Sequence, residues 1–171
     1  VVPISGAWKV ARGPARSEFP ARRQAALGPT SATALHRAMI HPIRHLTVAG
    51  HLWYQGESNR GNARDYADLL AAMVEDWRGD HLDRPFLIVQ IAPYRYEGDR
   101  GETARLREAQ RQASMAIPNA GLATTMDCGD PLDIHPARKQ PVGSRLARLA
   151  LAQRYDMDVV PSGPVFVEAV R

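Results

Sequence analysis

The sequence is poor in cysteine and lacks long apolar runs. Its single cysteine, Cys128, allows no intrachain disulfide and no zinc site built from several cysteines. No apolar run approaches the ~20 residues of a membrane span, and nothing resembles a signal peptide. We therefore expect no membrane partner. The lone cysteine leaves the redox compartment open.

Excess charge is also absent from most of the chain. The formal net charge is +4, with a pI of about 9.6. Residues 9–23 carry five basic residues against Glu18, so this segment alone accounts for the net charge. No groove-reading or base-stacking motif accompanies it. We interpret residues 1–30 as a solvated arm rich in Arg, Pro and Gly, and we expect no nucleic-acid partner. A protein that binds nucleic acid through this basic arm is kept as an alternative.

The remaining sequence is typical of a globular protein. The chain has 171 residues, of which 44% are hydrophobic and 23% charged, enough for one domain with a core. Short apolar or β-branched runs, about 35 residues apart, predict three strands: 48–54, 85–91 and 121–126. Helices are predicted after each of them, at 62–77, 103–116 and 142–155, from apolar residues spaced along one helical face.

This alternation of strands and helices predicts an α/β fold. The strands should be parallel and covered by helices on both faces, and helical residues 35–45 should lead into the first strand. The strand ends carry the polar runs YQGESN, QIAPYR and DCGDPLDIHP. Because ligands bind beyond the carboxyl ends of parallel strands, these runs predict one site at a common rim.

The last run holds a candidate general base. Asp133 precedes His135 by two residues in a turn bounded by prolines. A carboxylate so close to an imidazole can hold its tautomer and stabilise its protonated form. A structural turn explains the same pattern, so the pair alone is a weak signal.

Further runs carry a family resemblance. They are ALHRAMIHPI, WYQGESN, DYADLLAAMVEDWR, PFLIVQIAPY, LREAQ, IPNAGLATTMDCGD and DIHPARKQPVGSRLARLALAQRYD. In this order, over residues 31–171, they resemble the sialate O-acetylesterase family of SGNH-type hydrolases. The resemblance implies a flavodoxin-like sheet flanked by helices and a Ser-His-Asp site for acyl transfer. It divides the chain into the arm, an SGNH-hydrolase-like domain at 31–158 and a C-terminal extension at 159–171.

The resemblance also assigns roles. His135 matches the catalytic base, and Asp133 matches its carboxylate partner. Residues 55–59 match the block beside the oxyanion hole. Here Gln55 or Asn59 would donate to the oxyanion, Gly56 would permit close approach, and Glu57 would fix neighbouring groups.

The family's nucleophile is not matched. It lies in a Gly-Gln-Ser-Asn turn that this sequence lacks. We therefore expect the sheet to be incomplete at its N-terminal side. Either the serine lies outside these 171 residues, or Ser58 replaces it at the same rim. Ser5 is a weaker candidate. Cys128 is a better intrinsic nucleophile, but a lone cysteine at a strand end usually packs as a small hydrophobe.

Other features suggest a metal site or a sugar platform. His41 and His45 have helical i, i+4 spacing, but Pro42 lies between them and no acidic residue supports the set. We therefore predict neither a metal nor a cofactor. Trp53 and Tyr54 can either stack on a sugar or fill the core.

Together these features predict an esterase that removes acetyl groups from carbohydrate hydroxyls. Its partner would be a small acetylated substrate, and an exposed sheet edge would permit a homo-oligomer. The alternative is a non-catalytic module of the same fold that binds glycans or esters without a nucleophile.

Overall fold

The computed structural model describes residues 28, 31–79, 84–165 and 168–169. By their internal contacts, residues 1–46 and 47–171 form separate units. The described part of the first unit contains a π-helix, η2 (His36–Ile40), followed by a 3-10 helix, η3 (His41–Ile43). The predicted helical segment is therefore helical, but not as a regular α-helix. Pro42 has no N–H for the α-helical ladder, which accounts for the change of helix type.

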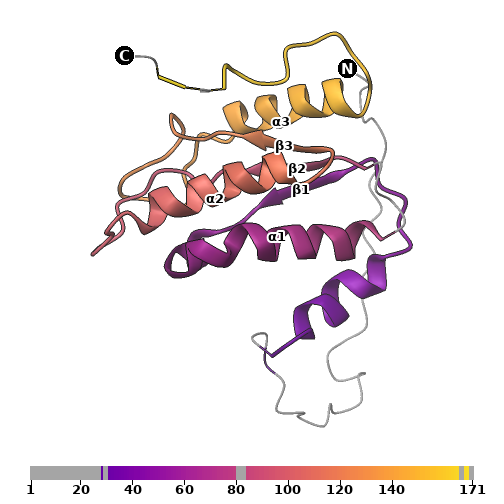
Figure 1. The fold of residues 1–171 in the computed structure, drawn as a ribbon, viewed down its shortest axis with the longest axis horizontal. Coiled ribbons are helices and arrows are strands. Elements are labelled where there is room, and N and C mark those ends of the chain that lie inside the picture. The colour runs from indigo at the N-terminus through magenta and orange to yellow at the C-terminus, as the bar shows by residue number, and fades with distance from the viewer. Residues whose placement is uncertain (1–27, 29–30, 80–83, 166–167, 170–171) are drawn as a thin grey trace, which may run out of the picture. The chain divides into compact units, whose positions relative to one another are not determined.

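The second unit is built on a parallel sheet, as the sequence predicts. Its strands are β1 (His51–Tyr54), β2 (Phe86–Val89) and β3 (Ala120–Ala123), in the order β1-β2-β3 (Figure 1). Trp53 lies opposite Ile88, and Ile88 lies opposite Leu122. Each observed strand is shorter than its apolar run, because the run continues into the adjoining loop.

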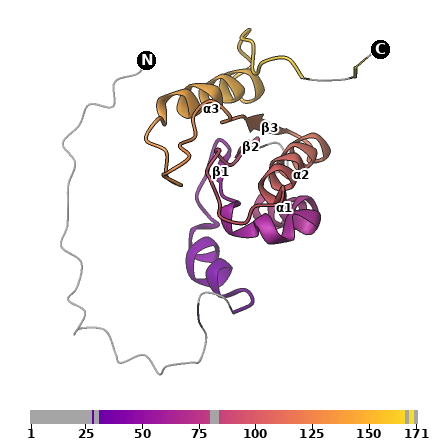
Figure 2. The same ribbon diagram turned by 90° about the vertical axis from the view of Figure 1, so that its left-hand side faces the viewer.

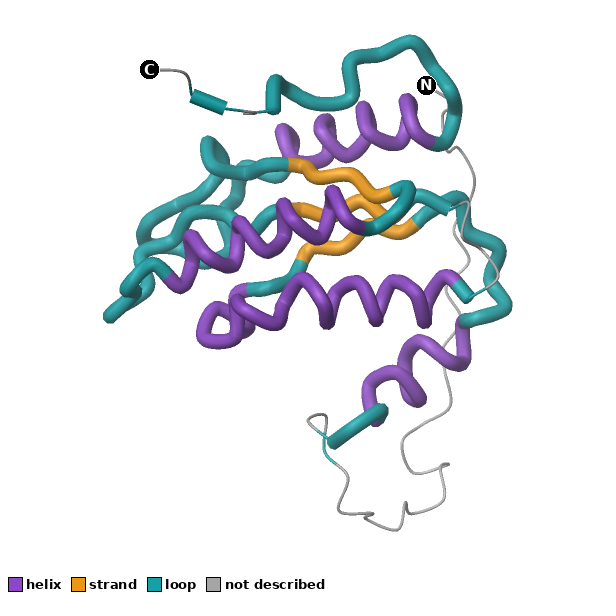
Figure 3. Tube along the Cα trace, in the orientation of Figure 1, coloured by secondary structure: helices purple, strands orange, loops and turns teal. Residues whose placement is uncertain are grey.

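Helices cover both faces of this sheet, which confirms the predicted layers. They are α1 (Ala63–Arg78), α2 (Glu102–Ala116) and α3 (Gln140–Gln153), and a 3-10 helix, η4 (Glu57–Asn62), precedes α1. Figure 2 shows α1 and α2 on one side of the strands and α3 on the other, and Figure 3 shows the strands between the helices. Phe86 and Ile88 pack toward α1 and α2, whereas Leu87 packs with Leu149 of α3.

Burial differs between the strands because α3 packs mainly on β2 and β3. All four residues of β2 are buried, as expected for a central strand covered on both faces. In β1, Leu52 is 66% exposed and Tyr54 is 37% exposed, whereas Trp53 packs against Trp77 and Phe86. Trp53 is therefore partly buried and packs against the core, whereas Tyr54 is the more exposed aromatic side chain.

Buried polar groups connect the layers. Arg78, at the end of α1, donates to the backbone oxygens of Pro118 at 2.6 Å and Asn119 at 2.9 Å. These bonds fix the turn that leads into β3. Across the described residues, no helix is both long and apolar enough to cross a bilayer.

Candidate active site

The loop that follows β3 places two of the predicted residues, His135 and Ser58, around one cavity. Strand order places the ends of β1 and β3 on opposite edges, with β2 between them. The loop nevertheless returns to the end of β1 and closes a cavity of about 400 Å³ there. The cavity is lined by Tyr54, Glu57, Ser58, Ile134, His135 and Lys139. The candidate base and Ser58 therefore share one cavity.

His135 is held through its backbone, and its ring is exposed. Asp133 Oδ1 accepts a hydrogen bond from the His135 backbone N–H at 2.8 Å. The same oxygen lies 4.0 Å from Nδ1 of the imidazole, which is ion-pair distance but too long for a hydrogen bond. The two side chains are 89% and 61% exposed. Asp133 therefore stabilises the turn through the backbone. The imidazole must move by about 1 Å before its Nδ1 can form a hydrogen bond with Asp133.

Cys128 and the start of the loop are anchored on α3. Arg145 donates to both carboxylate oxygens of Asp127 at 2.7 Å, and this guanidinium holds the pKa of Asp127 well below its usual range. Cys128 is buried with Val89 and Val142. Its thiol is therefore packed as a small hydrophobe and does not line the cavity.

Gly56 gives the β1 end its tight turn. Its φ is +150°, and a Cβ there would lie 3.0 Å from Ile91 Cγ2 and 3.2 Å from Leu106 Cδ2. Glycine is therefore required by close packing on the core. The close approach that the structure shows is to the protein interior, and a close approach of substrate to Gly56 stays a prediction.

A hydrogen-bond network fixes the neighbouring residues. Gln55 Nε2 donates to Asn59 Oδ1 at 2.6 Å, and the Tyr66 hydroxyl donates to Gln55 at its backbone oxygen (3.1 Å) and at Oε1 (3.2 Å). Burial raises the pKa of Tyr66, which keeps this hydroxyl protonated and donating. Neither Gln55 nor Asn59 lines the cavity. Their oxyanion role stays a prediction.

Gln110 of α2 is the centre of this network. Its side chain is completely buried; Oε1 accepts from the Ile91 N–H at 2.9 Å, and Nε2 donates to Gln55 O at 3.0 Å and to Val89 O at 3.4 Å. It therefore joins the carboxyl ends of β1 and β2. Gln110 ends the run LREAQ, and a polar residue on the apolar face of a helix was the sequence signal available for this role.

Lys139 is a second residue that the sequence analysis did not single out. Its Nζ lies 4.9 Å from the centroid of the Tyr54 ring, and both residues line the cavity. Burial, and then the charge of Glu57, raise the pKa of Tyr54, so its ring carries a neutral phenol. The available signal was the rarity of lysine, since Lys139 is one of two in the chain.

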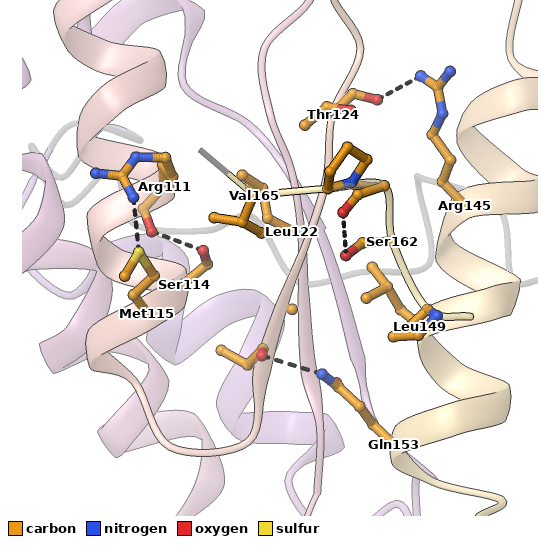
Figure 4. Close-up of a pocket in the computed structure, with 16 residues that line it drawn as sticks. Arg111, Ser114, Met115, Leu122, Thr124, Arg145, Leu149, Gln153, Ser162 and Val165 are labelled. Atoms are coloured by element: carbon orange, nitrogen blue, oxygen red, sulfur yellow. Dashed lines mark hydrogen bonds between the residues drawn. The ribbon is translucent and has the colours of Figure 1, made fainter. Parts of the chain in front are cut away.

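A second cavity, of about 440 Å³, lies at the free edge of β3 (Figure 4). It contains none of the predicted site residues. Side chains of α3 cap the edge there: Gln153 donates to Ala120 O at 3.3 Å, and Arg145 donates to Thr124 O at 2.7 Å. Capped edge carbonyls resist pairing with another strand. We therefore interpret this region as a protected edge.

Some of the remaining candidates lie outside the residues that the structure describes. Ser5 and the basic arm fall outside the described residues, except Gly28. The described residues hold no cluster of three or more side chains able to bind a metal. His41 contacts Arg44, whose charge lowers the pKa of His41. His51 stacks on Phe86 at 5.5 Å.

The parallel sheet with helices on both faces defines an α/β protein, and a cavity that contains His135 lies at the carboxyl end of its strands. The family model described as "Carbohydrate esterase, sialic acid-specific acetylesterase" matches residues 30–152. The chain belongs to this family of carbohydrate esterases.

Named relatives agree with this assignment. The chain is 33% identical over 159 residues to sialate O-acetylesterase of Mus musculus, covering 81% of this chain and 29% of the relative. It is 33% identical over 160 residues to the Homo sapiens enzyme, covering 81% and 30%. A carbohydrate acetylesterase from Xanthomonas citri has a solved structure with a TM-score of 0.72 and 42% identity, over 77% of this chain and 32% of that chain. The chain thus spans about three tenths of the length of these relatives.

Proposed function

We propose that this chain carries the base-bearing part of an acetylesterase site that acts on acetylated carbohydrate hydroxyls. The observation that supports this most is the cavity shared by His135 and Ser58, in a chain of a carbohydrate esterase family. Family membership favours the substrate class, and the cavity supplies a base beside a hydroxyl. No cofactor is required by this chemistry.

The proposed reaction is acyl transfer in two steps. His135 takes the proton of a nucleophilic hydroxyl while the oxygen of that hydroxyl attacks the acetyl carbonyl, and then gives the proton to the sugar oxygen as the ester bond breaks. Water, deprotonated by the same imidazole, attacks the acyl-enzyme, and the imidazolium returns a proton to the oxygen of the nucleophile as acetate leaves. In this proposal Asp133 stabilises the imidazolium once the ring has turned toward it.

We assign the nucleophile to Ser58 or to a serine that these 171 residues do not contain. Ser58 is favoured within the chain because it lines the cavity with His135 and its side chain is exposed there. Cys128 is disfavoured because it is buried. Ser5 is a weaker candidate for the nucleophile.

We assign the oxyanion donor to Asn59 in preference to Gln55. Gln55 uses Nε2 to hold Asn59 Oδ1, and this contact leaves the amide nitrogen of Asn59 without a protein partner in the described part of the chain. A single donor of this kind is worth about 3 kcal/mol in the transition state. Gly56 and Glu57 then act by shaping this block.

Hydrolysis of an acetylated sugar tests the proposal. Acetate release by the 171-residue chain should be abolished in His135→Ala and kept in His45→Ala, which removes an exposed histidine outside the cavity. This control separates the effect of the cavity histidine from the general effect of removing an exposed imidazole. Binding of the sugar ester without acetate release from the intact chain would instead support the non-catalytic module.

A fluorophosphonate probe separates the nucleophile assignments. Mass spectrometry of the labelled peptides should place the adduct on Ser58, and Ser58→Ala should remove it. A folded chain that takes up no probe would refute Ser58 and leave only a serine outside these residues.

We also propose that β1 provides an association surface. It is an edge strand, and Leu52 is 66% exposed on the face that α3 leaves uncovered. Such an edge favours pairing with another strand, from a second copy or from further chain. Analytical ultracentrifugation should detect a dimer that Leu52→Lys weakens; a monomer at all concentrations would contradict self-association.

A further inference from the structure

The loop that follows β2 lies between the two parts of the candidate site. We call residues 93–96 the β2 loop. Ser58 follows β1 on η4, and His135 lies in the loop that follows β3, so the central strand separates the two elements that bear them. Contacts of the β2 loop with both neighbours can therefore determine where Ser58 and His135 lie relative to each other.

On one side, the β2 loop crosses the His135 loop at a glycine. A Cβ at Gly129 would meet the backbone oxygen of Pro93, and it would lie 2.6 Å from Pro93 Cδ and 2.7 Å from Pro93 N. These atoms belong to the main chain or to the proline ring, so no side-chain rotation can make room for a methyl group. The Arg95 N–H also donates to Pro131 O at 3.2 Å. The His135 loop therefore passes over β2 in direct contact with its backbone.

On the other side, the β2 loop holds η4 through an aromatic stack. The guanidinium carbon of Arg60 lies 3.4 Å from the centroid of the Tyr96 ring, and Tyr94 packs edge-on against that ring with the centroids 4.7 Å apart. Arg60 Nε and the Tyr96 hydroxyl are buried and form no hydrogen bond within the described residues, so the contact rests on the ring face. Because Arg60 follows Ser58 in the same 3-10 helix, the stack ties Ser58 to the β2 loop.

His135 depends on such external contacts for its placement. Its ring is 89% exposed, and the hydrogen bond from Asp133 holds only its backbone N–H. Direct packing around the imidazole is therefore slight, and the path of its loop decides where the ring lies. A misplacement of about 1 Å can cost about 10²-fold in rate, so this path matters for chemistry.

We propose that the β2 loop positions the two parts of the site relative to each other, with Gly129 and Tyr96 as positioning residues. Gly129 lets the His135 loop lie against Pro93, and Tyr96 holds the helix that bears Ser58. Neither positioning residue lines the cavity, so both act through other residues. This inference rests on the proposed acetylesterase function, in which His135 acts on a nucleophile at the end of β1.

Amide chemical shifts measure the placement without turnover. In the unmodified chain, His135→Ala should shift the amide signals of Glu57 and Ser58, which line the cavity with it. In a Gly129→Ala background the same replacement should leave these signals in place, because the added methyl group displaces the His135 loop from Pro93. Gly61→Ala is the matched control, since a Cβ at this position in η4 meets no atom within 4 Å. The control should keep the full response.

Two replacements of Tyr96 test the other contact independently. Tyr96→Phe keeps the ring beneath Arg60 and should keep the response of Ser58 to His135→Ala. Tyr96→Leu removes the aromatic face and should lose this response. Urea melts establish which variants are folded, and the Tyr96 pair decides the inference if Gly129→Ala does not fold. A full response of Ser58 in folded Gly129→Ala, or in Tyr96→Leu, would overturn the inference.

Turnover adds a measure that a purely structural role would not move. With an acetylated sugar, Gly129→Ala should lower kcat by about 10²-fold with little change in KM, because the base is misplaced while the other cavity residues stay. Gly61→Ala should keep both constants.

Failure of this inference is distinguishable from failure of the proposed function. If acetyl esters are hydrolysed equally well by the unmodified chain and by Gly129→Ala, the positioning role is refuted and the acetylesterase proposal stands. If the response of Ser58 depends on Gly129 but no acetyl ester is hydrolysed, the acetylesterase proposal is refuted and the positioning role of the β2 loop stands.

Discussion

Replacement of Gln110 by methionine tests whether the buried network supports the site. Methionine has a similar length and volume but can neither accept from Ile91 N–H nor donate to Gln55 O. The Ile91 N–H would be left without its partner in a fully buried position. Gln55 O would still accept a hydrogen bond from the Tyr66 hydroxyl, so losing the bond from Gln110 costs less stability there.

The magnitude follows from these contacts. A buried donor left unsatisfied costs about 1–3 kcal/mol, and loss of the two bonds from Nε2 adds about 1 kcal/mol. We therefore expect Gln110→Met to lower the free energy of unfolding by about 2–4 kcal/mol. Urea denaturation followed by tryptophan fluorescence measures this, because Trp53 and Trp77 pack in the core.

Gln112→Met is the matched control. Gln112 lies on the same helix, but its side chain is exposed and donates only to Glu108 at 3.1 Å. Its replacement should change stability by less than about 0.5 kcal/mol. If Gln110→Met is as stable as Gln112→Met, the bonds of Gln110 do not support the carboxyl ends of β1 and β2, and the reasoning fails.

Two further predictions concern the pH dependence of stability and the Gly56 turn. Because Arg145 lowers the pKa of Asp127 in the folded protein below its ordinary value of 3.8, this pair stabilises the fold above about pH 4 and loses its effect as the pH falls through the lower folded-state value. Asp127→Asn should therefore be less stable than the unmodified chain at pH 7, with a narrower gap at pH 2.5 in urea melts; an unchanged gap would contradict the assignment. Gly56→Ala should lower the unfolding free energy by about 1–3 kcal/mol through its positive φ and crowded Cβ, whereas Gly143→Ala, in an uncrowded turn of α3, should raise it by up to about 1 kcal/mol. Equal thermal midpoints for these two variants would show that an added Cβ at Gly56 does not destabilise the fold.

Much of the fold was predictable because its signals are local. The apolar run at 85–91 indicates a buried strand by composition alone, and the helical spacing of Tyr66, Leu70 and Val74 gives the buried face of α1. Parallel strands with covering helices follow from the alternation of these elements. The form of the segment around Pro42 was less predictable, because local hydrogen bonding decides between α, π and 3-10 turns.

Some residues of the cavity were predictable from the sequence, but their contacts were not. Sequence places His135 and Ser58 at strand ends, and the returning loop brings them into one cavity although β1 and β3 are opposite edges. The distance between His135 and Asp133 depends on an Asx-type turn, which sequence spacing cannot determine. Lys139 reaches the cavity only through tertiary packing of α3 beside Tyr54.

The central claim is that the loop after β3 carries His135 across the sheet to the end of β1. Amide ¹H–¹⁵N spectra of the 171-residue chain and of His135→Ala test it directly. We predict chemical-shift changes at Tyr54, Glu57 and Ser58 in addition to those of residues 131–140. Changes confined to residues 131–140 would contradict the shared cavity, and with it the acyl-transfer site proposed for this chain.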